Sequence, residues 1–326
     1  MHHSTWYRLT RGLTLAILTA LCTLTLGATG AAESPSSDEL DSALAPLTVG
    51  IMPAVDSIPI IVAQEAGFFA DEGLTVTIEL FRDQLYREAS LQSNRIDATV
   101  SDLVNAIRSW QNGADYRVLT LTQGRFSLLT SAESPVDSLA AWPTEGNLET
   151  GAIEDSVIFY TAVRMLQRAG VDPSRMEIVP TLQIPVRLEL LSAGELEAAI
   201  LPEPIARIAV GAGANELIDS SVLDWTAGIV IATGTALEQK REELEAFLRA
   251  YNRGVVAFDA SPETYIEAVV ATAGFPPPTA NTMQTPEFRP AAVPTEAQVE
   301  DVAAWMLERG LIDRMPAQPE IVERLY

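Results

Sequence analysis

The sequence predicts an α/β protein of two lobes, each with a mostly parallel sheet covered by helices, joined by a two-crossing hinge. Its 326 residues exceed what one hydrophobic core usually serves. Apolar runs of strand length alternate with segments of helical periodicity, which is typical of parallel sheets with covered faces. A segment reading LQSNRIDATVSDLVNA also recurs one hundred residues later as LLSAGELEAAILPEPIAR. Two equivalent units imply two similar lobes.

The repeated segment is expected to end a helix, turn, form a short buried strand and begin a new helix. Asn94 and Gly194 occupy the turn, and both suit the left-handed conformation that closes a helix. Ser101 and Asp102 follow the first strand, and Glu203 between two prolines follows the second. Ligands of open α/β sheets bind at the carboxyl ends of strands, where helix N-termini leave backbone N–H groups unpaired. These two turns are therefore candidate ligand contacts, although Ser101 and Asp102 also suit simple helix capping.

The elements of the first lobe alternate from residue 47 onward. Strands are expected over residues 47–52, 74–80, 96–100, 116–122 and 126–131, and helices over 56–69, 83–93 and 103–111. Asp56 or Ser57 is expected to cap the first helix, with Pro59 in its first turn. Residues 134–151, rich in Pro, Gly and polar residues, are interpreted as the crossing into the second lobe.

The second lobe repeats the alternation. Strands are expected over 152–153, 176–179 and 198–201, and helices over 155–169, 184–192 and 205–211, the first capped by Asp155 or Ser156. Residues 225–233 are a strand that returns to the first lobe, before helices over 236–258 and 294–309, the last ended by Gly310. The expected boundaries are 47–132 with 234–326 for lobe 1, and 133–233 for lobe 2.

The N-terminus has the pattern of a signal peptide over residues 1–32. Arg8 and Arg11 precede an apolar run at 13–26 that is too short to span a bilayer, and small residues follow at 28–32. A periplasmic or extracytoplasmic location is expected. Lipid anchoring at Cys22 is disfavoured, because Leu21 stands where a lipoprotein signal needs a small residue. Residues 33–46, rich in Ser, Pro and acids, are expected to be a disordered tether.

Composition excludes several classes of function. The formal charge of −23 makes nucleic-acid binding improbable. The only histidines, His2 and His3, and the only cysteine, Cys22, all lie in the signal segment. Their removal leaves no His base, no Cys nucleophile and no His or Cys metal ligand. We expect a binding protein with no catalytic residue, no cofactor and no metal. Catalysis by carboxylates stays open.

Five motifs in order resemble a known family. They read DSIPIIVAQEAGFFADEGLTVTIEL, LQSNRIDATVSD, AVRMLQRAGVDPSRMEIV, LSAGELEAAILPEPIA and VPTEAQVEDVAAWMLERGLID. Together they resemble the thiamine-pyrimidine, sulfonate and taurine-binding group (SsuA/TauA/ThiY-like) of periplasmic solute-binding proteins of ABC transporters. The resemblance implies a type II periplasmic binding protein that passes a small molecule to a membrane permease, as a monomer. The group also contains eukaryotic enzymes that make the thiamine pyrimidine with a cysteine-rich motif and a histidine, both lacking here.

The resemblance places the ligand among the loops that follow the strands of both lobes. Carried onto this chain, the candidate ligand-binding residues are Asp56, Ser57, Ser101, Asp102, Gln123, Gly124, Arg125, Glu154, Asp155, Ser156, Tyr160 and Glu203. Tyr160, Phe126 or Trp225 would supply a stacking face, unless they only pack in the core. Arg125 has the alternative of a surface charge, and Glu203 that of an ion pair with Arg207.

The ligand class follows from the charges of these candidates. Five carboxylates stand against one cation, Arg125, so the site is expected to want amino or amidine-like donors. This favours a neutral or cationic heteroaromatic such as a thiamine-type pyrimidine over a sulfonate, taurine or nitrate, which would bind on helix N-termini. Two alternatives remain on the same fold: a carboxylate-dependent lyase or dehydratase, and a sensor module that presents its ligand to a receptor.

Overall fold

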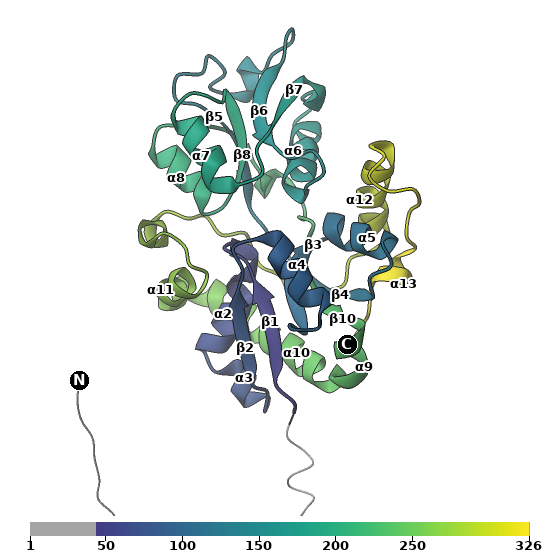
Figure 1. Cartoon of the computed structure of the whole chain (residues 1–326). Helices are drawn as coiled ribbons and strands as arrows, with labels where there is room; N and C mark the ends of the chain where they lie inside the picture. The colour runs from purple at the N-terminus through teal and green to yellow at the C-terminus, as the bar shows by residue number, and fades with distance from the viewer. Residues whose placement is uncertain (1–43, 326) are drawn as a thin grey trace, which may run out of the picture. The chain divides into compact units, whose positions relative to one another are not determined.

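The computed structural model describes residues 44–325, which form two lobes with one five-stranded sheet each (Figure 1). The sheet of lobe 1 has the order β2 (Val76–Leu80), β1 (Leu47–Ile51), β3 (Ala98–Asp102), β10 (Gly228–Thr233) and β4 (Tyr116–Thr122). The sheet of lobe 2 has the order β7 (Met176–Pro180), β6 (Leu148–Ala152), β8 (Ala198–Pro202), β5 (Phe126–Thr130) and β9 (Asn215–Asp219). The predicted architecture of two mostly parallel sheets is confirmed.

The two sheets have the same topology and register. β1 pairs in parallel with β2 and β3, as β6 does with β7 and β8, and the fourth strand of each sheet runs antiparallel. Val49 lies opposite Ala98 in lobe 1, and Thr150 lies opposite Ala198 in lobe 2. Asn94 and Gly194 both adopt the predicted left-handed conformation, with φ of 53° and 70°. The repeat in the sequence therefore corresponds to two sheets with the same strand order and register.

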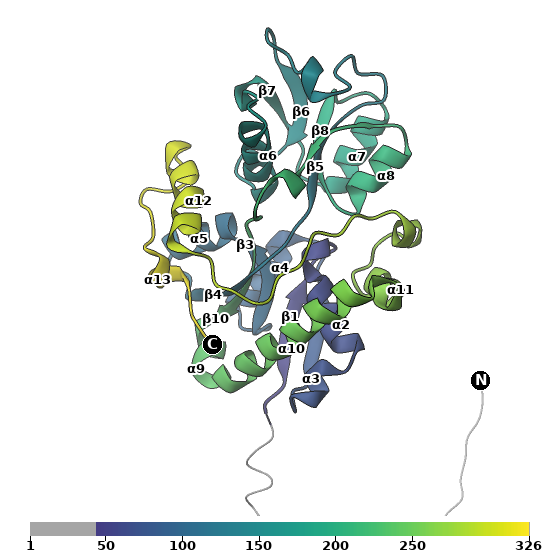
Figure 2. The ribbon, with the colours of Figure 1, turned by 180° about the vertical axis from the view of Figure 1, so that it is seen from behind.

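Helices cover both faces of each sheet. Lobe 1 carries α2 (Ile58–Glu65), α3 (Phe68–Asp71), α4 (Gln84–Gln92), α5 (Leu103–Gln111), α9 (Gly234–Gln239), α10 (Arg241–Ala260) and α11 (Pro262–Thr272), and lobe 2 carries α6 (Val157–Arg168), α7 (Ile184–Ser192) and α8 (Ile205–Gly211). In Figure 1, α4 lies in front of the lobe 1 sheet. In Figure 2, which shows the opposite side, α10 lies in front of the same sheet. α10 packs closely on α2, since a Cβ at Gly254 would lie 2.3 Å from the carbonyl oxygen of Pro59.

Several predicted elements differ in their ends. The predicted helix 56–69 is interrupted at Gly67, whose φ of 75° ends α2 and begins α3. The predicted helix 236–258 is divided at Lys240 into α9 and α10, and the strand predicted at 152–153 begins at Leu148. β9 was not predicted, because NELID carries only two apolar residues in five.

Both lobe boundaries lie one strand away from the expected positions. β5 was assigned to lobe 1 but pairs with β8 and β9, and β10 was assigned to lobe 2 but pairs with β3 and β4. The chain therefore crosses at residues 123–125 and 220–227 rather than near 132 and 233. A buried strand has the same apolar pattern in either sheet. Its sequence therefore does not indicate which of the two sheets it pairs with.

A third connection joins the lobes at the C-terminal side. Residues 283–295, here called the strap, have no regular secondary structure. The Leu121 N–H of β4 donates to the Ala292 carbonyl at 2.8 Å, and the strap's Gln284 accepts a 2.7 Å bond from Arg125 at the first crossing. α12 (Glu296–Glu308) follows, and then α13 (Gln318–Ile321).

α12 contacts both lobes. Its Trp305 belongs to one continuous apolar cluster with Ile107 of α5 in lobe 1 and Phe159 of α6 in lobe 2. Trp305 also meets the Tyr160 ring edge-on at 5.3 Å. On the neighbouring turn Asp301 pairs with Arg164 of α6 at 2.7 Å. The lobes are therefore joined by packed side chains as well as by crossings.

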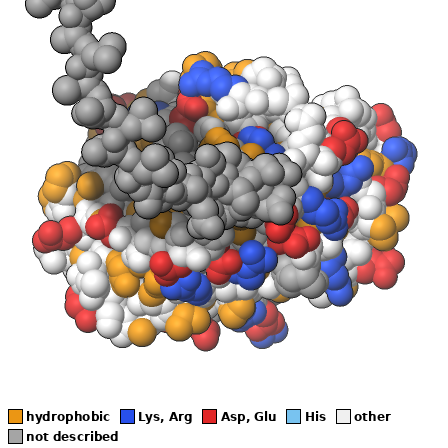
Figure 3. Space-filling model, turned by 90° about the horizontal axis from the view of Figure 1, so that it is seen from below, with side chains coloured by type: hydrophobic (Ala, Val, Ile, Leu, Met, Phe, Trp, Pro, Cys, Tyr) orange, Lys and Arg blue, Asp and Glu red, His pale blue; other side chains and the backbone are white. Residues whose placement is uncertain are grey.

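Acidic and basic side chains are interspersed on the visible part of the face in Figure 3. Two ion pairs connect α10 with the end of α3, Arg249–Glu72 and Arg253–Asp71. Within residues 44–325 no helix is both long and apolar enough to cross a membrane. The expected signal segment and Cys22 lie outside the described residues, as does most of the expected tether 33–46.

Candidate ligand-binding site

Four candidates gather at the carboxyl end of the lobe 1 sheet. Asp56 and Ser57 form a 3₁₀ turn between β1 and α2, while Ser101 and Asp102 end β3. Asp102 caps α5, since its carboxylate accepts from the Asn105 backbone N–H at 2.9 Å and from the Asn105 side chain at 2.6 Å. Ser57 precedes α2 without a side-chain cap bond and donates weakly to the Met52 carbonyl at 3.3 Å.

A buried arginine that the sequence analysis missed lies beside these residues. Arg87 on α4 donates from Nη1 to the Val100 carbonyl at 2.9 Å, and its Nη2 lies 3.4 Å from the hydroxyl of Ser101. Nη2 also pairs with Glu88 at 2.5 Å. A sequence signal existed, because Arg187 stands one hundred residues later, at the same offset as the rest of the repeat.

The two acids of this edge have raised pKa values. Burial raises the pKa of Asp56 from 3.8 to about 7, and the Asp102 charge adds to this effect while Arg87 opposes it. Burial also raises the pKa of Asp102, against the hydrogen bonds from Asn105 and the charge of Arg87. Neither acid has a direct ion pair in the described structure. The positive charge of the Arg87 guanidinium acts on both carboxyl groups.

Gln123, Gly124 and Arg125 form the first crossing, and the second crossing holds them. The Gly124 N–H donates to the Thr226 hydroxyl at 2.9 Å, and that hydroxyl lies 3.4 Å from the Gln123 amide oxygen. Arg125 forms a 2.9 Å ion pair with Asp219 and is only 16% exposed. The alternative of a free surface charge is therefore wrong for Arg125.

Glu154, Asp155 and Ser156 lie before α6. Ser156 caps this helix by accepting from the Phe159 N–H at 3.3 Å. Asp155 forms a 3.1 Å ion pair with Arg108 of α5, which links the two lobes. Glu154 is exposed and has no hydrogen bond or ion pair to other described residues.

Glu203 is fully buried and lies in an ion pair. Its Oε1 accepts from Nε of Arg207 at 2.9 Å, and Arg207 also contacts Glu216. Among the described residues Oε2 has no hydrogen-bond partner, although the backbone N–H of Gln284 favours the charged form of the carboxylate. Burial nevertheless raises the pKa of Glu203 to about 7. The pairing with Arg207, which the sequence left as an alternative, is present.

The three aromatic candidates differ in exposure. Tyr160 is buried, and its hydroxyl donates to Asp301 at 2.5 Å. Phe126 and Trp225 are partly exposed at the two crossings, where the Phe126 ring covers Gly124. The chain thus brings two aromatic rings to the crossings, while Tyr160 packs with α12.

The sequence from residue 54 to residue 265 matches the family model described as NMT1/THI5 like. The chain belongs to this family. No curated protein sequence matches this family member significantly.

Solved structures similar to this NMT1/THI5-like protein share its fold at low identity. One is the ligand-binding component of an ABC-type import system from Staphylococcus aureus with zinc bound, at 13% identity and a TM-score of 0.71, covering 86% of this chain and 97% of that one. Another is the alkanesulfonate-binding protein SsuA from Xanthomonas axonopodis pv. citri bound to MOPS, at 15% identity and 0.69, covering 86% and 99%. A third is the desulfurization enzyme DSZB, at 14% identity and 0.63, covering 86% and 96%. This likeness establishes the periplasmic binding protein fold.

The geometry changes the charge balance expected for this family member. Arg87, Arg108 and Arg207 join Arg125 at the strand ends, so the premise of five carboxylates against one cation is wrong. Arg87 and Arg108 were missed because they lie within helices, away from the strand-end turns, whereas Arg207 was expected only as a partner of Glu203. In lobe 2 the carboxylates of Asp155 and Glu203 are paired. No cluster of His, Cys, Asp or Glu suited to a metal ion occurs among residues 44–325.

Proposed function

We propose that this protein is the extracytoplasmic solute-binding component of an ABC importer. It would capture one small organic molecule at the strand ends of its two lobes and pass it, as a monomer, to a permease at the inner membrane. The fold shared with the ligand-binding component of an ABC-type import system and with an alkanesulfonate-binding protein supports this role. So does the signal-peptide pattern of residues 1–32.

The preferred ligand is an aminopyrimidine or a similar nitrogen heteroaromatic. The pair Asp56 and Asp102 supports this choice, because both acids have raised pKa values and neither forms a direct ion pair with another described residue. A ligand that donates N–H groups to both would supply the missing positive field and lower both pKa values. Phe126 and Trp225, partly exposed at the crossings, would offer the ring a stacking face.

A sulfonate is the second candidate. The MOPS-bound relative favours it, and the N-termini of α2, α5 and α6 with Arg87 would stabilise an anion. Such an anion would lie near Asp56 and Asp102 and would bind best when both are protonated. The two ligand classes therefore have opposite pH dependence: the amine strengthens as pH rises through 7, and the sulfonate strengthens as pH falls.

Calorimetric titration at pH 6 and pH 8 separates these cases. We expect 4-aminopyrimidine to bind more tightly at pH 8, and Asp56→Asn to weaken it on the order of tenfold, since a charged hydrogen bond contributes roughly 1.5 kcal/mol. Glu133→Gln is the control, because Glu133 is exposed, unpaired among the described residues and outside the candidate site. Tighter binding of taurine or MOPS at pH 6 would instead assign the sulfonate.

Recovery of the ligand tests the carrier against an enzyme of the same fold. Mass spectrometry of ligand recovered after incubation with the protein should return it unchanged. A mass shift that Asp56→Asn abolishes would replace the carrier with a carboxylate-dependent enzyme. Failure of every pyrimidine, sulfonate and amino acid to raise the melting temperature would overturn the binding role, because a specific ligand stabilises the native state.

A further inference from the structure

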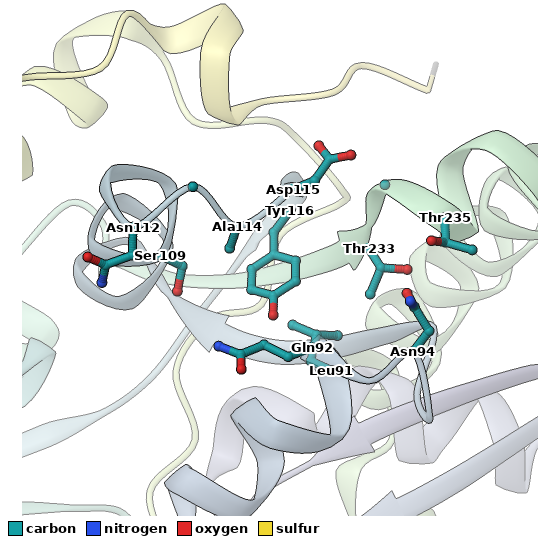
Figure 4. Close-up of a pocket in the computed structure, with 12 residues that line it drawn as sticks. Leu91, Gln92, Asn94, Ser109, Asn112, Ala114, Asp115, Tyr116, Thr233 and Thr235 are labelled. Carbon is teal, nitrogen blue, oxygen red and sulfur yellow. The ribbon is translucent and has the colours of Figure 1, made fainter.

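A cavity of about 360 Å³ lies in lobe 1 (Figure 4). It is at the end of the sheet where β3 and β4 begin, and the candidate ligand-binding site is at the opposite end of these strands. The cavity is lined by the ends of α4 and α5, the loop that leads into β4, and the end of β10: Leu91, Gln92, Asn94, Ser109, Asn112, Gly113, Ala114, Asp115, Tyr116, Thr233, Gly234 and Thr235. Thr233 pairs with Tyr116 in the sheet, and its N–H donates to Asp97, just before β3 begins. Ser101 and Asp102 stand at the other end of β3.

The lining is polar and holds no basic residue. The side chains of Gln92, Asn94, Ser109, Asn112 and Thr235 have no hydrogen-bond partner among the described residues. The Tyr116 hydroxyl likewise has no hydrogen-bond partner within residues 44–325, although the residue is 92% buried, and burial together with the Glu88 charge raises its pKa to about 12. In Figure 4 the Tyr116 side chain points toward the end of α4, which carries Leu91 and Gln92. A buried hydroxyl without a partner is uncommon in native proteins.

The electrostatics of the cavity favour a cation. α4 and α5 both end here, so the negative ends of two helices point at the same space. Asp115 adds a carboxylate that is 68% exposed and shared with Arg117 at 2.8 Å. The short helix α9 also begins at the rim, but the Thr233 hydroxyl already accepts from its Ala236 N–H at 3.1 Å. The net charge of −23 adds a long-range attraction for cations.

We propose that this cavity binds a small organic ammonium ion that carries a hydroxyl group. Its N–H donors would bond to Asp115 and to amide oxygens of Asn94 and Asn112, and its hydroxyl would meet Ser109 or Thr235. Gln92 is exposed and lines the same cavity, so its amide is a further polar contact for the ligand. The volume is ample for such a small molecule. This site is separate from the ligand-binding site proposed above.

Titration of the whole mature protein with ethanolammonium, followed by backbone amide NMR, tests the site. Shifts are expected at residues 91–94, 112–116 and 233–235, and not at Asp56, Ser101 or Asp102. Ethylene glycol and acetate, the neutral and anionic controls, should leave these residues unshifted. Asp115→Asn should weaken binding about fivefold, as the loss of an exposed ion pair predicts, while Glu133→Gln should leave it unchanged.

Ala114→Phe provides an independent test, because it fills the cavity without changing charge. It should abolish the shifts while the circular dichroism spectrum keeps its native form. Equal shifts with ethylene glycol, shifts confined to the opposite edge, or no shift at about 50 mM ethanolammonium, well above a millimolar dissociation constant, would each overturn the proposal.

Discussion

Arg87 and Arg187 hold equivalent positions in the two lobes. Nη1 of Arg87 donates to the Val100 carbonyl at 2.9 Å, and Nη1 of Arg187 donates to the Ile200 carbonyl at 2.7 Å. Their other partners differ, since Arg87 pairs with Glu88 while Arg187 bonds only to carbonyl oxygens among the described residues. Burial accordingly lowers the pKa of Arg187 to about 10. The arginine at this repeated position therefore has an acidic environment in lobe 1 and a neutral environment in lobe 2.

Arg187→Lys should destabilise the fold on the order of 2 kcal/mol. A lysine keeps the charge but lacks the fork that reaches both the Thr181 and the Ile200 carbonyl. Urea denaturation measures the loss. Ligand affinity should be unchanged, whereas the matched Arg87→Lys variant should alter both stability and affinity, because Arg87 acts on Asp56. Equal effects of the two variants on affinity would contradict this division of roles.

Asp56→Asn should stabilise the ligand-free protein at pH 8 but not at pH 4. Between 3.8 and about 7 the folded protein keeps a proton that the unfolded chain has released, so wild-type stability falls as pH rises through this window. Asparagine does not titrate, and the variant avoids the loss, which we place on the order of 1 to 3 kcal/mol. Thermal melts across pH check it. A stability difference independent of pH would disprove the raised pKa.

Arg207→Met should destabilise the fold at pH 8 on the order of 2 to 4 kcal/mol, because it leaves the buried Glu203 carboxylate unpaired. The pKa of Glu203, already about 7, would rise further. Protonation below that pKa removes the buried charge, so the loss should shrink at pH 5. Chemical denaturation at both pH values measures this loss of stability.

Glu203→Gln should change ligand affinity by less than about twofold, because Glu203 pairs with Arg207 and has a structural role. This corresponds to a difference in binding free energy below about 0.5 kcal/mol.

Tyr160→Phe should loosen the contact between α6 and α12. It removes the hydroxyl that donates to Asp301 at 2.5 Å and leaves the ring against Trp305 in place. The expected cost is about 1 kcal/mol, with faster amide hydrogen exchange in residues 157–168. Thr161→Ser serves as a neighbouring control, because its hydroxyl still reaches the Val157 carbonyl within the same helix. Unchanged exchange would mean that α12 does not hold lobe 2 through this bond.

The sequence was informative wherever local physics decides the structure. The turns at Asn94 and Gly194, and the helices α5, α7 and α8, lie where their periodicity and turn residues predicted them. The destinations of β5 and β10 were not predictable, since an apolar strand pairs with whichever sheet edge the chain presents. Long-range contacts decide such cases, and a single sequence carries little information about them.

The candidate site shows the same division. Asp102 and Ser156 cap helices at the predicted places because capping is a local property. Arg87 was missed because an arginine inside a helix is usually a surface residue, and only its register with Arg187 distinguishes it. The backbone N–H of Gln284, which acts on Glu203, comes from the strap, 81 residues further along the chain, so no local pattern indicated this contact.

The order in which the two lobes fold also follows from the positions of β5 and β10. β5 belongs to the lobe 2 sheet, and β10 returns to the lobe 1 sheet. Every strand of lobe 2 comes from one contiguous stretch, residues 126–219, so its sheet closes as soon as that stretch is available. In lobe 1, β4 has no neighbouring strand until β10 arrives from beyond lobe 2. A chain that emerges from its N-terminus therefore finishes the second lobe while the first still has an unpaired strand. During synthesis, the part of the chain made first is the part completed last.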